Sequence, residues 1–256
     1  MNEYKIYPLI NMILNNEQSM QTYTKNFGVR IDTPIVFFLV QGNGLNILVD
    51  SGACDAETAT KNHHPCRQTE DMLPANLVRA HGVEPEDIDT IIISHLHWDH
   101  CYNLEVFPNA KIYVQRRELQ YAIDPLPIHN LFYEAPSSGL RAPWLDHLDR
   151  MVVMDGDYSI ADGIDVLLMP GHTPGMQNVL VNTSAGKYLI ATDNIPSMLN
   201  WEGIGSWKHV PSTIHNDLNE YWKTLERMEK VCDYILPGHD MVVSEHPVYP
   251  DPADCK

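Results

Sequence analysis

Basic residues are scarce in this sequence. Its 256 residues include 17 Lys and Arg against 34 Asp and Glu, which gives a formal net charge of −17. Such an acidic chain repels phosphate backbones and anionic lipid surfaces, so we expect neither a nucleic-acid partner nor a membrane partner. The charge does not exclude an anionic small-molecule substrate, because bound metal ions can reverse the sign of the local field.

Long apolar runs are also absent, and cysteine is rare. No stretch approaches the roughly 20 apolar residues that span a bilayer. The N-terminal MNEYKIYPLINMILNN lacks the basic start and the small-residue cleavage site of an export signal. The five cysteines are odd in number and have no CxxC spacing. These features favour reduced thiols and a cytoplasmic location over a disulfide framework.

No Gly/Ser-rich linker, charge run or internal repeat divides the sequence. A chain of 256 residues with 44% hydrophobic content is long enough to bury one sizeable core. We therefore predict a single domain over residues 1–256. The first 33 residues carry no pattern that we can interpret, and the sequence leaves open whether the chain forms a homodimer.

Several short apolar segments have the composition of β-strands. Residues 34–41 and 45–50 flank the turn Gly42-Asn43-Gly44, and Asn-Gly between apolar runs is a hairpin signal. The β-branched run at 90–94 is typical of a strand that is buried on both faces. Further strands are predicted at 111–115, 164–170, 177–183, 187–193 and the first part of 233–240.

Two segments have helical patterns. They cover residues 69–81 and residues 216–231, and the second has an apolar face formed by Leu218, Trp222, Leu225 and Met228. Two hairpin-rich halves, each closed by helices, indicate β-sheets that pack together with helices outside. We expect residues 120–150 and 195–215 to form long loops that border a functional cleft.

The most informative motif, His95-Leu-His97-Trp-Asp99-His100, directly follows the strand predicted at 90–94. Neutral imidazoles and carboxylates are the ligands that suit zinc and similar divalent ions. A turn could divide the motif into His95 with His97 and Asp99 with His100, which suits two adjacent metals. A His-rich surface loop would be an equally good interpretation of a lone His-x-His.

Three later elements repeat this placement. Pro-Gly-His172, Thr-Asp193-Asn and Pro-Gly-His239 each put a potential ligand just past the end of a predicted strand. Because ligand chemistry and position recur independently, the sequence predicts a metal site. Seven ligands exceed what one tetrahedral ion uses, which predicts two divalent ions. Zinc is the default, and manganese, iron and cobalt accept the same ligand types.

These motifs together resemble the metallo-β-lactamase superfamily over nearly all of residues 34–240. The resemblance implies an α/β fold, the αββα four-layer sandwich, with its site at the sheet edges. The segments that carry it, in order and in spacing, are LVDSG (48–52), SHLHWDH (94–100), PGHTPG (170–175), ATDN (191–194) and LPGHD (236–240). It assigns one metal to His95, His97 and His172, the second to Asp99, His100 and His239, and both to the bridging Asp193.

A narrower similarity is to the N-acyl homoserine lactonases, carried by LVDSGACDAE, the segment that precedes SHLHWDH, and KIYVQRREL. It implies a hydrolase that opens a lactone or a similar cyclic ester. Two divalent ions would activate water and polarise the carbonyl group. Asp99 would steer the attacking group or move a proton, and Asp50 would orient a metal-binding histidine or, alternatively, only close a turn.

The sequence departs from the lactonase pattern beside the site. Those lactonases usually carry a tyrosine three residues after the bridging aspartate, where this chain has Pro196. They usually have small residues directly after the motif that ends at His100, where this chain has Cys101 and Tyr102. Of the nearby polar groups Asn194, Ser197 and Tyr102, we predict that the Tyr102 hydroxyl supplies the missing hydrogen-bond donor. The alternative is a tyrosine that only packs beside the metal loop.

Two other functions fit the same ligands. A thioester or other ester or amide hydrolase resembling glyoxalase II has this metal motif, but that group adds a C-terminal helical domain with basic residues that grip glutathione, and residues 240–256 show no such segment. A non-catalytic metal-binding protein would more plausibly lack a ligand, and none of the seven is missing. The eight other histidines, His64 among them, lack ligand spacing, so we interpret them as surface or structural residues.

Overall fold

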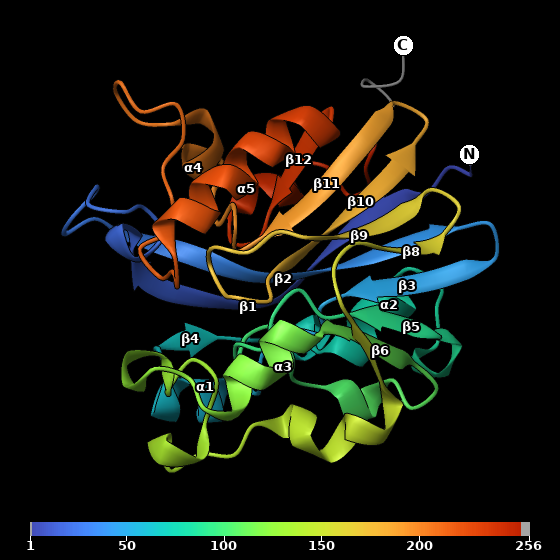
Figure 1. The fold of residues 1–256 in the computed structure, drawn as a ribbon. Helices are drawn as coiled ribbons and strands as arrows, with labels where there is room; N and C mark the ends of the chain where they lie inside the picture. The colour runs from blue at the N-terminus through green and yellow to red at the C-terminus, as the bar shows by residue number, and fades with distance from the viewer. Residues whose placement is uncertain (1, 252–256) are drawn as a thin grey trace.

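Two β-sheets packed face to face form the centre of the molecule (Figure 1). The computed structural model describes residues 2–251. The larger sheet has the strand order β4-β1-β2-β3-β5-β6-β7. Its strands are β1 (Lys5–Glu17), β2 (Arg30–Gly42), β3 (Leu45–Val49), β4 (Cys66–Arg67), β5 (Thr90–Ile92), β6 (Lys111–Gln115) and β7 (Met151–Met154).

The smaller sheet has the strand order β12-β11-β10-β9-β8. Within it only β11 and β12 pair in parallel. Its strands are β8 (Tyr158–Ala161), β9 (Ile164–Leu168), β10 (Gln177–Thr183), β11 (Gly186–Thr192) and β12 (Tyr234–Pro237).

Strand β2 shows why the sheets stack. Its side chains alternate between the two faces of the sheet, as the twofold repeat of a strand requires. Val36, Phe38 and Val40 point to the other sheet and pack there with Val179 and Ile190. The intervening Phe37 and Leu39 pack on the opposite face with residues of α2 and β5. Both faces of β2 are therefore buried, which explains its nearly continuous apolar run.

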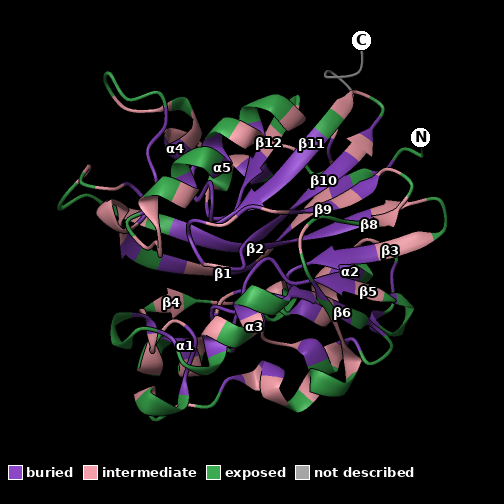
Figure 2. Ribbon diagram, in the orientation of Figure 1, coloured by how far each residue is buried: buried purple, intermediate pink, exposed green. Residues whose placement is uncertain are grey.

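Helices cover the outer face of each sheet, which makes four layers (Figure 1). Their solvent-facing sides are the main exposed surfaces of these layers (Figure 2). The larger sheet carries α1 (Ala56–Asn62), α2 (Pro74–Ala80) and α3 (Arg116–Ile123), and the smaller sheet carries α4 (Met198–Glu202) and α5 (Leu218–Val231). The αββα sandwich predicted from the sequence is confirmed.

The buried face of α5 agrees with the predicted one at Leu225 and Met228 but not at Trp222. Tyr221, Leu225 and Met228 pack against the smaller sheet, whereas Trp222 is 42% exposed. Tyr221 lies on this face in place of Trp222, and its hydroxyl donates hydrogen bonds to the backbone carbonyl oxygens of Asp193 and Asn194.

The strands predicted between 34 and 240 and the helix at 69–81 are confirmed within a few residues, but β1 was not predicted. Its register against β2 shifts between Ile10 and Met12, and this irregularity breaks the alternation that identifies a strand. The predicted loop at 120–150 contains the end of α3 and the 3₁₀ segments Pro127–His129, Pro136–Ser138 and Pro143–Arg150. The loop at 195–215 contains α4.

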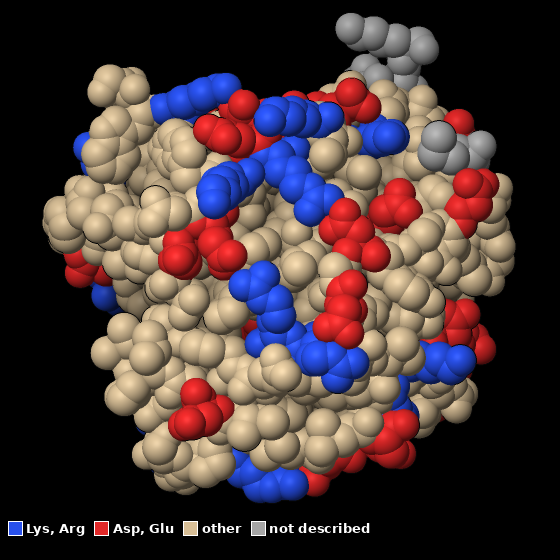
Figure 3. Space-filling view, in the orientation of Figure 1, with Lys and Arg blue, Asp and Glu red and all other residues tan. Residues whose placement is uncertain are grey.

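On the face that carries α3 and α5, basic and acidic side chains are interspersed (Figure 3). The excess of acidic residues therefore does not produce a uniformly acidic surface there. In residues 2–251, no helix is both long enough and apolar enough to cross a bilayer. Cys54, Cys66, Cys101 and Cys232 are free thiols, and Cys255 lies outside the described residues.

Candidate metal centre

The predicted ligands meet where strands of both sheets end. The loop after β5 of the larger sheet carries His95, His97, Asp99 and His100. The loops after β9, β11 and β12 of the smaller sheet carry His172, Asp193 and His239. All seven side chains fall into two adjacent groups of ligand atoms. The site therefore spans the junction of the two sheets.

Glycines at two of these strand ends let neighbouring elements approach the ligand loops. Gly171 has a φ of +145°, and a Cβ atom there would lie 2.4 Å from the Cα of Tyr221 in α5. A Cβ on Gly238 would lie 2.7 Å from the carbonyl carbon of Thr192 in β11. Any larger residue would push these elements away from His172 or His239.

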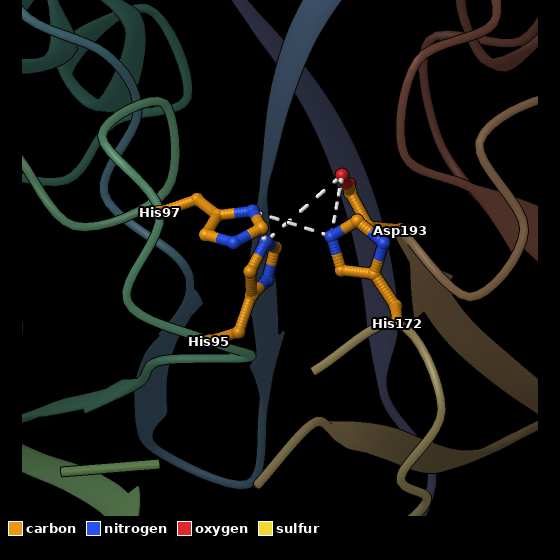
Figure 4. A group of neighbouring side chains, drawn as sticks. All are labelled: His95, His97, His172 and Asp193. Atoms are coloured by element: carbon orange, nitrogen blue, oxygen red, sulfur yellow. Dashed lines mark hydrogen bonds and ion pairs between the residues drawn. The ribbon is translucent and has the colours of Figure 1, made fainter. Parts of the chain in front are cut away.

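His95, His97 and His172, which we call the three-histidine group, point toward one another (Figure 4). His97 Nδ1 lies 3.0 Å from His95 Nε2 and 3.2 Å from His172 Nε2. The nearest carboxylate atom is Oδ2 of Asp193, 3.4 Å from His172 Nε2. Three ring nitrogens and one carboxylate oxygen thus surround a single point.

Asp99, His100 and His239, which we call the mixed group, lie on the other side of Asp193. Oδ1 of Asp193 is 3.1 Å from His100 Nε2 and 2.8 Å from His239 Nε2. Asp99 Oδ2 lies 3.8 Å and 3.7 Å from the same two nitrogens. One oxygen of Asp193 therefore faces each group, as a bridging carboxylate requires.

The far ring nitrogens of three histidines identify their tautomers. His172 Nδ1 lies 2.7 Å from the carbonyl oxygen of Ile214, and His239 Nδ1 lies 2.9 Å from that of Pro34. A carbonyl oxygen only accepts, so each Nδ1 carries the hydrogen and each Nε2 presents a lone pair to the centre. This donor chemistry fits a metal cation.

Asp50 holds the third of these histidines. Its Oδ2 is 2.7 Å from His100 Nδ1, and its carboxylate also accepts hydrogen bonds from the backbone N–H and the hydroxyl of Ser94. Asp50 has a φ of +65°, a conformation that aspartate tolerates better than most residues. The predicted contact between Asp50 and a ligand histidine is confirmed.

Burial and charge set the protonation of the cluster. Burial holds the pKa of His95 and of His97 well below the usual range and lowers the pKa of His172 to about 4. Burial disfavours the charged forms of His100 and His239, but the nearby carboxylates of Asp193 and Asp99, joined by Asp50 at His100, together outweigh it and raise the pKa of both. These two histidines in turn hold the pKa of Asp193 well below its usual value against the opposing effect of burial.

A cavity lies over the two groups and opens to solvent; the empty space within it, open solvent included, is about 540 Å³. His97, Asp99, Asp193 and His239 form part of its surface. The apolar lining residues are Leu14, Met20, Ile35, Trp98, Phe132, Pro196 and Ile214, and the polar ones are Asn16, Gln21, Thr33, His64 and Ser212.

The structure does not bring Tyr102 to this cluster. Its hydroxyl donates a 2.5 Å hydrogen bond to Glu134, and Tyr102 is not among the residues that line the cavity. Asn194 and Ser197 are also engaged, with Met169 and Asn200 respectively. The donor function predicted for Tyr102 therefore has no geometric basis in this arrangement.

Sequence reasoning missed four residues of the site and its surroundings. His64 was interpreted as surface or structural, yet it lines the cavity. Glu118 is fully buried and accepts hydrogen bonds from Leu96 N, Tyr133 Oη, Thr173 Oγ1 and Gly175 N, so it joins the loops of His95 and His172. Its place in the segment KIYVQRREL was the available signal. Asn16 and Gln21 come from the N-terminal region that had no interpretation.

Comparison with known proteins agrees with this geometry. The sequence profile of the metallo-beta-lactamase superfamily matches residues 30–239. This chain belongs to the metallo-beta-lactamase superfamily. The matched range includes every residue of the three-histidine group and of the mixed group.

Within the metallo-beta-lactamase superfamily, several similar relatives are N-acyl homoserine lactonases. An N-acyl homoserine lactonase from Bacillus sp is 30% identical over 224 residues, which cover 84% of this chain and 84% of the relative. The N-acyl homoserine lactonase AttM of Rhizobium radiobacter is 27% identical over 255 residues, which cover 94% of both proteins. The resemblance to this group is thus confirmed.

Solved structures agree with the fold. The B. thuringiensis AiiA structure with N-decanoyl-L-homoserine bound at its active site superposes with a TM-score of 0.78 at 25% identity, covering 98% of this chain and 99% of AiiA. AidC, a dizinc quorum-quenching lactonase, has a TM-score of 0.68 at 18% identity, covering 94% of this chain and 88% of AidC. The likeness to AidC supports the metallo-beta-lactamase fold alone.

Proposed function

We propose that this chain is a two-metal hydrolase that opens the ring of N-acyl homoserine lactones. The proposal treats residues 1–256 as one catalytic domain. Its main support is the placement of Asp193, whose two carboxylate oxygens face two separate ligand groups beneath one cavity. The names and structures of its relatives indicate the substrate class.

In this proposal His95, His97 and His172 hold one metal ion, Asp99, His100 and His239 hold the second, and Asp193 contacts both. Nitrogen and carboxylate ligands favour zinc as the native metal. When bound, the ions would supply Lewis-acid activation of the ester carbonyl and of water. The tautomers fixed by Ile214, Pro34 and Asp50 keep the lone pairs directed at these ions.

Asp99 would have a second function. Its side chain is 15% exposed, more than any ligand histidine, and it forms part of the cavity surface. A carboxylate in that position can accept a proton from attacking water and return it to the departing alcohol. The apolar residues around it would exclude bulk water and contact the acyl chain of the substrate.

Acid release from a substrate panel tests this function. Zinc-loaded protein is assayed by pH-stat with N-acyl homoserine lactones, unsubstituted lactones, thioesters and a β-lactam, with Asp193→Ala as the control. We expect the N-acyl lactones to have the highest kcat/KM and the control to be inactive. A preference for thioesters would support a glyoxalase II-like activity in place of the proposed one.

A further inference from the structure

The ring of His63 stacks on the indole of Trp98, behind one wall of the cavity. The two ring centroids are 4.0 Å apart, and the ring planes differ by only 4°. Trp98 lines the cavity together with its neighbour Asp99, whereas His63 is not among the lining residues. His63 therefore supports the indole from outside the space that a substrate would occupy, and the parallel contact restricts the tilt of the indole plane.

Glu134 holds His63 in this position. Its Oε1 is 3.0 Å from His63 Nε2, and both side chains are 2% exposed. The carboxylate accepts, so His63 Nε2 carries the hydrogen and donates it. The backbone of His63 is fixed as well, because its N–H donates to the carbonyl oxygen of Ala59 in α1 at 2.8 Å. Both the ring and the backbone of His63 are thus held in place.

Glu134 would be unfavourable at this position without these partners. Its φ is +47°, in the left-handed region that glutamate rarely adopts, and its carboxylate is buried. A buried carboxylate requires hydrogen-bond donors, and it has one for each oxygen: His63 at Oε1 and Tyr102 Oη, 2.5 Å away, at Oε2. Unfavourable backbone conformations that are held by their surroundings concentrate near functional sites.

The segment that contains Glu134 also holds the backbone of Trp98. The N–H of Trp98 donates to the carbonyl oxygen of Phe132 at 2.8 Å, and Phe132 itself lines the cavity. The indole is therefore fixed through its ring by His63 and through its backbone by Phe132. An aromatic surface that is fixed before a ligand binds loses little conformational entropy when the ligand arrives.

A second histidine–tryptophan stack provides a comparison. His209 stacks on Trp201 with ring centroids 4.6 Å apart, and its Nε2 is 2.6 Å from Glu229 Oε1. The three residue types are the same as in the first stack, but none of these three residues lines the cavity over the ligand groups. A change at His209 therefore disturbs the same kind of contact away from the cavity wall.

We propose that His63 and Glu134 are positioning residues that hold the Trp98 indole as a fixed wall of the cavity and thereby strengthen binding of the substrate's acyl group. This inference rests on the proposed lactone hydrolysis, in which the apolar lining contacts the acyl chain. Neither residue touches the reacting atoms. Their effect should therefore fall on KM for substrates with a long acyl chain, with kcat and metal content unchanged.

The kinetic test compares N-hexanoyl with N-acetyl homoserine lactone, using zinc-loaded protein. In His63→Ala we expect KM for the hexanoyl substrate to rise about tenfold, and KM for the acetyl substrate to stay within about twofold of wild type. Glu134→Leu should act in the same way. Glu134→Gln, whose amide oxygen still accepts from His63, should keep KM near the wild-type value. His209→Ala is the matched control and should change neither KM.

An unchanged KM for the hexanoyl substrate in His63→Ala, an equal rise for both substrates, or a fall in kcat alone would overturn the inference. His63→Ala decides the inference if Glu134→Leu, which removes a buried carboxylate, does not fold.

A second measurement does not depend on activity. The chain has five tryptophans, and after labelling with 5-fluorotryptophan the variant Trp98→Phe identifies the ¹⁹F NMR signal of Trp98. His63→Ala should shift this signal because the stacked ring is lost, whereas His209→Ala should shift the signal of Trp201 instead. An unchanged Trp98 signal in His63→Ala would overturn the inference. If wild-type protein hydrolyses no N-acyl lactone, the proposed function fails, but a Trp98 signal that moves with His63 would still support the positioning of the indole.

Discussion

The two ligand groups share Asp193 but differ in charge. The three-histidine group has no carboxylate of its own, and its rings contact one another at centroid distances of 4.4–5.0 Å. The mixed group contains Asp99 and has Asp50 directly behind His100. A cation in the mixed group would therefore face more negative charge than one in the three-histidine group.

Exposure also differs between the groups. The side chains of His95 and His172 are 0% and 1% exposed, whereas Asp99 and His239 are 15% and 7% exposed. His97 and His239 are 5% and 7% exposed and His100 is fully buried, so the difference in exposure between the groups comes mainly from Asp99. The comparison teaches that the two metals should not be equivalent, and we expect them to bind with distinct affinities.

The largest effect should come from Asp193→Ala, because this residue faces both groups. We expect bound metal to fall below one ion per chain and kcat/KM to fall about a thousandfold or more. Elemental analysis and the lactonase assay measure both quantities. His81→Ala, outside the site, is the control. Retention of two ions and full activity would show that Asp193 does not bridge the groups.

Single-group variants separate the two sites. His172→Ala should leave the mixed group intact, and His239→Ala should leave the three-histidine group intact. Each variant should bind about one ion per chain, and titration with zinc should give two different dissociation constants. Identical titration curves for the two variants would contradict the expected difference in metal affinity between the two groups.

A smaller, one-sided effect is expected from Asp50→Asn. Asparagine also tolerates the positive φ at this position but loses one of the oxygens that hold His100 and Ser94. Loss of such an outer contact typically weakens metal binding about 10- to 100-fold. Zinc titration should therefore show weaker binding of one ion only. Equal weakening of both ions would mean that Asp50 supports the whole cluster.

Glu118→Gln should disturb the three-histidine group more than the mixed group. Glu118 joins Leu96 to Thr173 and Gly175, and an amide cannot accept all four of its hydrogen bonds. We expect about 1–3 kcal/mol lower stability and weaker metal binding at this group. Thermal unfolding of the zinc-free and zinc-loaded variant measures the two contributions. An unchanged affinity would limit Glu118 to a structural function.

Tyr102→Phe should have the smallest effect on catalysis. The hydroxyl is hydrogen-bonded to Glu134, which in turn contacts His63 at 3.0 Å, and Tyr102 does not line the cavity. We expect kcat to stay within about threefold of wild type, because a substitution that alters neither a ligand nor the cavity lining usually has a small effect. A loss of kcat of a hundredfold or more with unchanged metal content would restore the donor function predicted from the sequence.

The ligands could be predicted from the sequence because each follows a recognisable strand by only a few residues. His95, His172 and His239 depend on local chain geometry that their motifs encode. The cavity wall could not be predicted, since Gln21 meets His239 across 218 residues of sequence and through an irregular strand that lacks clean alternation.

Tyr102 shows the same limit at shorter range. Its position two residues after His100 places it near the site in sequence, but the direction of its side chain is set by Glu134, 32 residues further along the chain. Trp222 was assigned to the buried face of α5 for a related reason, because its neighbour Tyr221 occupies that face through contacts with Asp193 and Asn194. The sequence predicts helices and strands, whereas the direction of these side chains depends on tertiary contacts.

The ligands are divided between the two sheets, four after β5 and three after β9, β11 and β12. Any ion bound here would cross-link the two sheets. Its binding free energy would add to the free energy of unfolding of the sandwich. Metal removal should therefore loosen the junction of the two halves as well as stop the chemistry. In a cell with little free zinc, the amount of folded protein would then follow the metal supply.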